Sequence, residues 1–230
     1  MNVLSTLRAL RGRGAKKENH LLRVEVSASA LEHNAKVFKG VIKDRKLAIV
    51  LKSNAYGHGL REEGKIADSL EDVDWLVVDS IVEARALRGV GTKKPIMIIG
   101  YVPRARWSKL SKLGKVALVV TSLDQARELA EFIKFKLDVH IKVDTGMRRQ
   151  GIMPEELGEM IAVLRRNKRL KITGLATHFA DADGEEDDAT LEQIRVWQDV
   201  VDLYRKRVGD GLFHISATAG TRFIDRAHSN

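Results

Sequence analysis

Short β-branched runs alternate with longer segments of helical period from about residue 21 onward, and this alternation most constrains the fold. It is typical of parallel βαβ units. Two of the runs, Ile96–Ile99 and Ala117–Val120, are apolar throughout, as expected of strands buried on both faces. We predict eight strands, over Leu21–Ser27, Lys46–Asn54, Asp74–Ile81, Pro95–Tyr101, Lys115–Ser122, Asp138–Thr145, Lys171–Ala180 and Phe213–Ala219.

The segments between these strands carry signals of helix starts and buried helix faces. Ser80-x-x-Glu83 and Ser122-x-x-Gln125 have the form of capping boxes. No GxGxxG turn follows an early strand, so eight strand candidates favour an α/β fold of the (β/α)8 TIM-barrel type over an open sheet. Ligand groups should then lie where strands end. One buried helical stripe is predicted from Leu191, Ile194, Trp197, Val200, Val201 and Tyr204.

Charge and composition limit the function classes. The net charge is +9, and part of the excess lies in residues 1–20, which we expect to form a basic, flexible tail before one barrel domain over residues 21–230. The chain has no cysteine, which excludes disulfides and thiolate-bound metal. No basic stripe is interleaved with aromatic residues, and no apolar run is long enough to span a bilayer. We expect a cytoplasmic protein without a nucleic-acid or membrane partner.

Residues 181–188 hold six carboxylates, but their spacing does not match a calcium-binding loop. We expect a solvated loop and no metal site.

Lys52 is the strongest candidate for chemistry. It ends the apolar run Leu47–Leu51 and enters the glycine-bearing loop Ser53–Gly59. Desolvation at the end of a barrel strand disfavours the ammonium form, so such a lysine is a better nucleophile toward an aldehyde. A lone lysine is more often a packed stem with a solvated head. The sequence around Lys52 must therefore distinguish a reactive lysine from a packed one.

That context resembles the alanine racemase family, whose members depend on pyridoxal 5'-phosphate (PLP). The segment Val50–Gly59, which reads VLKSNAYGHG, is similar to the family's PLP-lysine signature. Lys142–Gly151, KVDTGMRRQG, resembles its arginine-bearing loop, and Gly174–Asp183, GLATHFADAD, resembles its histidine-bearing strand. The three blocks follow the family order, each near the end of a predicted strand.

The resemblance implies a role for each matching residue. Lys52 would form the Schiff base with PLP, and Tyr56 would hydrogen-bond toward the cofactor phosphate. Arg149 would lie near the cofactor's phenolic oxygen and bind the substrate carboxylate, a role that suits its fork of donors. Lys142 matches a position that is carbamylated in some members, and His178 would lie beside the cofactor ring.

A fourth block, Phe213–Gly220, departs from the family pattern. The family has Asn-Ser where this chain has Ala217-Thr218. Thr218 keeps a hydroxyl for the phosphate, whereas Ala217 cannot supply the amide contact.

The resemblance implies an isomerase of D-alanine biosynthesis, a homodimer at full length, that interconverts L-alanine and D-alanine by two-base proton transfer. Lys52 would be one base. The other would be a tyrosine in a C-terminal β domain of the partner subunit. We expect this chain to be a fragment that lacks the last barrel strand and that domain, and to racemise poorly. The family places Leu21–Ser27 against that domain, so seven strands would belong to the barrel.

Other readings stay open. One is a single-domain PLP-binding protein of cofactor homeostasis without turnover, and others are a decarboxylase of the same barrel type or a non-enzymatic basic protein. Alanine, serine or another amino acid could be the substrate.

Overall fold

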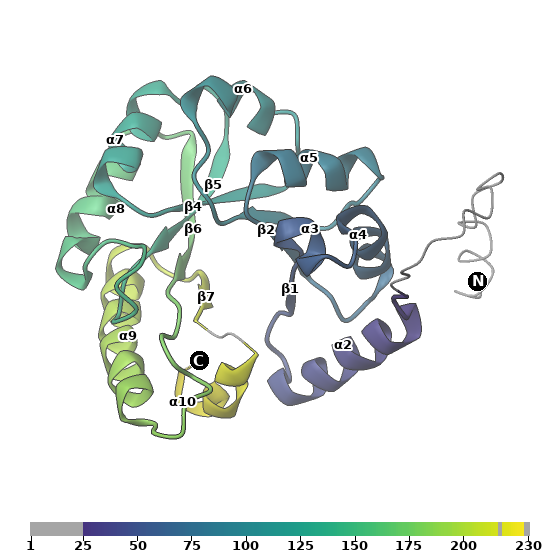
Figure 1. Ribbon diagram of the computed structural model, residues 1–230. Coiled ribbons are helices and arrows are strands. Elements are labelled where there is room, and N and C mark those ends of the chain that lie inside the picture. The colour runs from purple at the N-terminus through teal and green to yellow at the C-terminus, as the bar shows by residue number, and fades with distance from the viewer. Residues whose placement is uncertain (1–24, 216–217, 228–230) are drawn as a thin grey trace.

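The computed structural model describes residues 25–215 and 218–227. Its centre is a curved sheet of seven parallel strands in which each strand pairs with the next along the chain. Figure 1 shows the sheet curling into part of a barrel, with the helices around its outer side. The strands are β1 (Ala48–Val50), β2 (Trp75–Val78), β3 (Ile96–Ile98), β4 (Val116–Val120), β5 (Leu137–Lys142), β6 (Leu170–Ala176) and β7 (Leu212–His214).

The helices begin where the sequence signals them. Ser80 and Glu83 form a complete capping box, and the Ser122 hydroxyl accepts a hydrogen bond from the Gln125 N–H. The Gln125 side chain accepts from Thr121 N–H at 3.0 Å, one residue earlier than the motif predicts. The helices are α2 (Ala28–Ile42), α3 (Lys52–Tyr56), α4 (Leu60–Ser69), α5 (Ile81–Gly89), α6 (Trp107–Leu110), α7 (Leu123–Phe132), α8 (Leu157–Arg165), α9 (Asp188–Arg207) and α10 (Ile224–Ala227), with 3-10 turns η1 (Arg104–Arg106), η2 (Pro154–Glu156) and η3 (Ala219–Phe223).

Alternate residues of the strands face two different cores. Outward residues such as Leu76, Ile98 and Leu118 join the large core beneath the helices, together with the predicted α9 stripe. Inward residues Val77, Met97 and Val119 form a smaller cluster inside the barrel. Because side chains alternate along a strand, Ala48 and Val50 of β1 point inward, as their pairing with Trp75 and Val77 of β2 indicates. The α/β barrel prediction is confirmed on this arrangement.

The prediction of a further strand over Leu21–Ser27 is wrong for residues 25–27, the part of this segment that the structure describes. Residues 21–24 lie outside the described residues, as does the predicted tail over residues 1–20. Glu25–Ser27 are not strand, because the Ser27 hydroxyl accepts the Ala30 N–H and caps α2. The other seven strands are confirmed, and all are shorter than predicted. After β1, β5, β6 and β7, the last predicted residues belong to the segments that carry predicted site residues.

Two histidines lie side by side inside the barrel. His140 of β5 is fully buried, and its Nδ1 lies 2.9 Å from Nε2 of His214 at the end of β7. The neighbouring position on β6 is Gly174, where a Cβ would lie 2.5 Å from the His140 ring. Burial lowers the pKa of His140 to about 4. The ring is therefore neutral at neutral pH.

Candidate active site

Lys52 lies where β1 ends, and a left-handed turn follows it. Ser53, Asn54, Ala55 and Tyr56 all have φ between 52° and 56°, and Gly57 continues at 94°. L-amino acids pay roughly 1–2 kcal/mol per residue in left-handed helical backbone, so such a run persists only where surrounding contacts hold it. Lys52 itself is half-buried at the start of this turn.

Hydrogen bonds hold the turn on both sides. Within it, the Leu51 carbonyl accepts Ala55 N–H at 2.9 Å, and the Asn54 carbonyl accepts both Gly57 and Gly59 N–H. The Asn54 side chain accepts Leu60 N–H at 2.9 Å, which ties the turn to the start of α4. The Ser53 N–H donates to the Glu83 carboxylate at 2.7 Å. The backbone that presents Lys52 is therefore anchored to two helices.

The arginine loop is built around Asp144, which follows β5. One carboxylate oxygen of Asp144 accepts the N–H groups of Gly146 and Arg148 at 2.9 and 3.0 Å, and the other accepts that of Arg149 at 3.0 Å. Burial alone would raise the pKa of Asp144, but these backbone donors outweigh it, so the pKa lies below its usual value. Gly151 closes the loop at φ 134°, where a Cβ would lie 2.7 Å from the Asp144 nitrogen.

Replacing Asp144 with asparagine should destabilise the protein by about 1–3 kcal/mol, because one oxygen that accepts backbone N–H groups becomes an NH2 group. Urea unfolding of the parent and the variant measures this difference. Asp138→Asn is the matched control, since Asp138 is exposed on β5, the strand that leads into this loop. Equal losses in both variants would contradict the central place of Asp144 in the loop.

Four cationic or titratable side chains come together at the carboxyl ends of the strands. Lys52 follows β1, Lys142 ends β5, Arg149 lies on the loop after it, and His178 follows β6. Burial lowers the pKa of Lys142, and the charges of Arg149 and Lys52 lower it further, against the opposing effect of Asp144. Burial likewise lowers the pKa of His178, with Lys142, Arg149 and Lys52 adding to the effect. Across residues 25–215 and 218–227, none of the four forms an ion pair.

The sequence analysis missed Gln193, which lies on α9 and connects two of these loops. Its side-chain amide donates to the Thr145 hydroxyl at 3.2 Å and to the His178 carbonyl at 3.1 Å. Its oxygen accepts Ala180 N–H at 2.8 Å. Gln193 is only 4% exposed. A polar residue at the helical spacing of the α9 stripe is the one signal that could have identified it.

Two other predicted site residues do not join the cluster of four. The Tyr56 side chain is 63% exposed on the left-handed turn. Thr218 is exposed at the start of η3, where its carbonyl accepts from the Thr221 N–H and hydroxyl. Ala217, where the chain departs from the family pattern, lies outside the described residues. The phosphate contacts assigned to Tyr56 and Thr218 therefore stay predictions.

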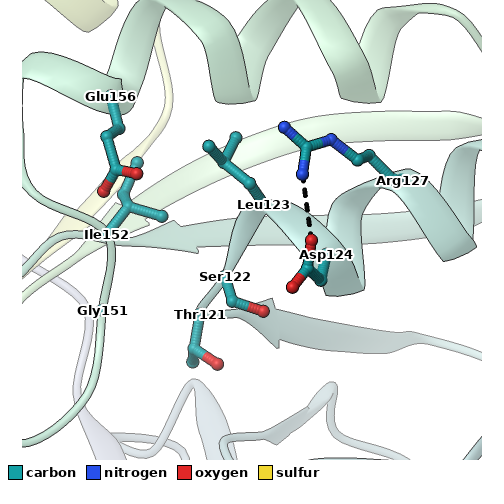
Figure 2. A pocket seen from close by; sticks show the side chains of 8 residues that line it. All are labelled: Thr121, Ser122, Leu123, Asp124, Arg127, Gly151, Ile152 and Glu156. Atoms are coloured by element: carbon teal, nitrogen blue, oxygen red, sulfur yellow. Dashed lines mark hydrogen bonds and ion pairs between the residues drawn. The ribbon is translucent and has the colours of Figure 1, made fainter.

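A separate pocket of about 320 Å³ lies beside the arginine loop (Figure 2). Figure 2 shows the ion pair between the Asp124 and Arg127 side chains at the start of α7. The distance from Arg127 Nη1 to Asp124 Oδ1 is 2.9 Å. None of the four clustered side chains lines this pocket, so we do not assign it to the candidate site. Its lining residues are Thr121, Ser122, Leu123, Asp124, Arg127, Gly151, Ile152 and Glu156.

The acidic segment after His178 also has structural contacts. Asp187 ends the segment before α9, and its carboxylate pairs with Arg222 at 2.7 Å. Within the described ranges, no three His, Asp or Glu side chains are grouped so that they could hold a metal ion. No helix in those ranges is both long and apolar enough to cross a membrane.

The fold and the site together define a class of protein: a parallel α/β barrel with a cationic site at the carboxyl ends of its strands. Residues 26–230 match the family described as "Alanine racemase, N-terminal domain". The chain belongs to this family.

Individual relatives agree with this assignment. The chain is 33% identical to the alanine racemase of Methanococcus maripaludis over 219 residues, which cover 92% of this chain and 58% of the relative. It is similar to the crystal structure of alanine racemase from Oenococcus oeni, with 30% identity, a TM-score of 0.75, and coverage of 86% and 57%. For the enzyme from Corynebacterium glutamicum the TM-score is 0.78 at 26% identity, with the same coverage. The chain thus spans little more than half the length of these relatives.

Proposed function

We propose that this chain is the cofactor-binding part of a PLP-dependent alanine racemase, with Lys52 as the residue that binds PLP. The observation that carries the proposal is the group of Lys52, Lys142, Arg149 and His178 at the carboxyl ends of the strands, none of which has an ion-pair partner among the residues that the structure describes. The three segments that resemble the family's signatures contain the same residues.

The chemistry of this donor set fits PLP. Two lysines and an arginine within electrostatic reach of one another repel, and a bound anion relieves that repulsion. PLP carries a phosphate and a phenolic oxygen, and its substrate carries a carboxylate. Among the described residues, the one carboxylate that raises the pKa of Lys142 is Asp144, and its oxygens already accept backbone N–H groups. When bound, PLP supplies an electron sink that acidifies the Cα proton of an amino acid.

The residues of this chain would have different roles in the reaction. Lys52 supplies the amine that holds the cofactor and, once freed by substrate, a group that moves a proton to or from Cα on one face. Arg149 binds anionic oxygens of cofactor and substrate through its paired donors. The lowered pKa of Lys142 increases the fraction of its amine that is neutral, and a neutral amine can add carbon dioxide and release a proton to give a carbamate. Such a carbamate would stand as an anion beside Arg149.

Racemisation needs a proton taken from one face of Cα and returned on the other. We propose that the second proton-transfer group comes from a partner subunit, and that the active protein is a homodimer acting on alanine.

The test is to incubate the chain with PLP and L-alanine and to measure the D-alanine formed by chiral chromatography. One incubation contains the chain alone, and the other also contains a full-length racemase subunit that is inactivated at its own PLP lysine. D-alanine formed in the mixture and lost with Lys52→Ala supports the proposal. Bound PLP with no D-alanine in any mixture would contradict the racemase function.

A further inference from the structure

We infer that Glu83, at the start of α5, is a positioning residue for Lys52. This inference rests on the proposed role of Lys52 as the PLP-binding residue. Glu83 does not touch the candidate cofactor site, and it acts through the backbone of Ser53, the residue that follows Lys52.

The two carboxylate oxygens of Glu83 serve two different segments. Oε2 accepts the N–H groups of Asp79 and Ser80 at 2.9 and 3.0 Å, which is the capping-box contact of α5. Oε1 accepts the N–H of Ser53 at 2.7 Å, 30 residues away in the sequence. A capping box needs only the first of these contacts. The second is an addition that the cap does not require.

The contact falls where the backbone most needs support. Ser53 is the first of four consecutive non-glycine residues in left-handed backbone, and it is exposed. The N–H groups of Ala55, Gly57 and Gly59 are bonded within the turn, whereas that of Ser53 is bonded to α5. Release of this N–H would let the turn relax toward ordinary backbone, and the direction of Lys52 would change with it.

The chemistry of glutamine separates the two contacts of Glu83. In Glu83→Gln the single carbonyl oxygen can still accept from Asp79 and Ser80, and glutamine also serves in capping boxes. The NH2 group must then face the Ser53 N–H, where two donors meet. Ser80→Ala is the matched control, because it removes the hydroxyl that caps the Glu83 N–H at 3.2 Å and leaves the Ser53 contact intact.

The first measurement needs no cofactor: amide hydrogen exchange of the peptide that contains residues 52–57. We expect Glu83→Gln to speed exchange in this segment by roughly tenfold, the scale of a lost hydrogen bond to a charged group, and Ser80→Ala to leave it unchanged. Equal rates of amide exchange in the parent and in Glu83→Gln would overturn the inference, whether or not the chain binds PLP.

The second measurement is the rate at which borohydride fixes PLP to Lys52. We expect a fall of roughly tenfold in Glu83→Gln, while Ser80→Ala keeps the parent rate even if it melts at lower temperature. Slowing in proportion to the loss of stability in both variants would mean a purely structural role and would overturn the inference. If the parent is not tagged at all, the proposed function of Lys52 fails, and the exchange experiment decides the role of Glu83 by itself.

Discussion

Lys52→Ala should abolish covalent attachment of PLP to this chain. The side chain is held at the start of a strained turn, among the four clustered side chains, and we expect no other amine to take its place there. After borohydride treatment the parent should carry one PLP group on Lys52. Trypsin does not cleave after a modified lysine, so the tag should appear on an uncut peptide over residues 47–61.

Lys142→Ala is the matched control for this experiment. Lys142 belongs to the same group of charges and is half-buried like Lys52, but it ends a different strand. It should keep the tag on Lys52, although we expect weaker binding of PLP because one positive charge is lost. Lys52→Arg keeps the charge and removes the reactive amine, and it should also lose the tag. A tag on any other lysine of the parent would contradict the proposed site.

The free energy of unfolding should fall by about 3 kcal/mol through His140 alone as the pH drops from 7 to 4. Burial holds the pKa of His140 at about 4, below its usual 6.5. The unfolded chain therefore takes up a proton before the folded protein does. The stability that His140 contributes is complete above pH 6.5 and is lost progressively as the pH falls toward 4. Urea unfolding at a series of pH values measures the slope.

His140→Gln should flatten this slope while lowering stability at neutral pH, because glutamine does not titrate and fits the pair with His214 less well. His33→Gln, on the exposed side of α2, is the control, since that ring is exposed to solvent in both states. An unchanged slope in His140→Gln would show that this ring is not kept neutral by the fold.

Much of the fold followed from local patterns. The apolar runs at Ile96–Ile98 and Val116–Val120 became strands, and the Ser80–Glu83 box begins α5 as predicted. The α9 stripe is buried as its spacing indicates, except for Leu191, which is partly buried. Local pattern failed at residues 25–27, the described end of the strand predicted over Leu21–Ser27, where the hydroxyl of Ser27 caps a helix instead. An alternating apolar run at a segment end carries no information about whether a neighbouring strand is present to pair with it.

Residue types at fixed spacing were enough to predict the parallel α/β architecture and the family, and to propose Lys52, Lys142, Arg149 and His178 as site residues. The long-range contacts around these residues could be found only in the folded protein. The contact of Glu83 with Ser53 and those of Gln193 with Thr145 and His178 join residues that are 15 to 48 positions apart. Such contacts depend on the curvature of the sheet and on how the helices pack on it. The spacing of residues within one segment predicts neither.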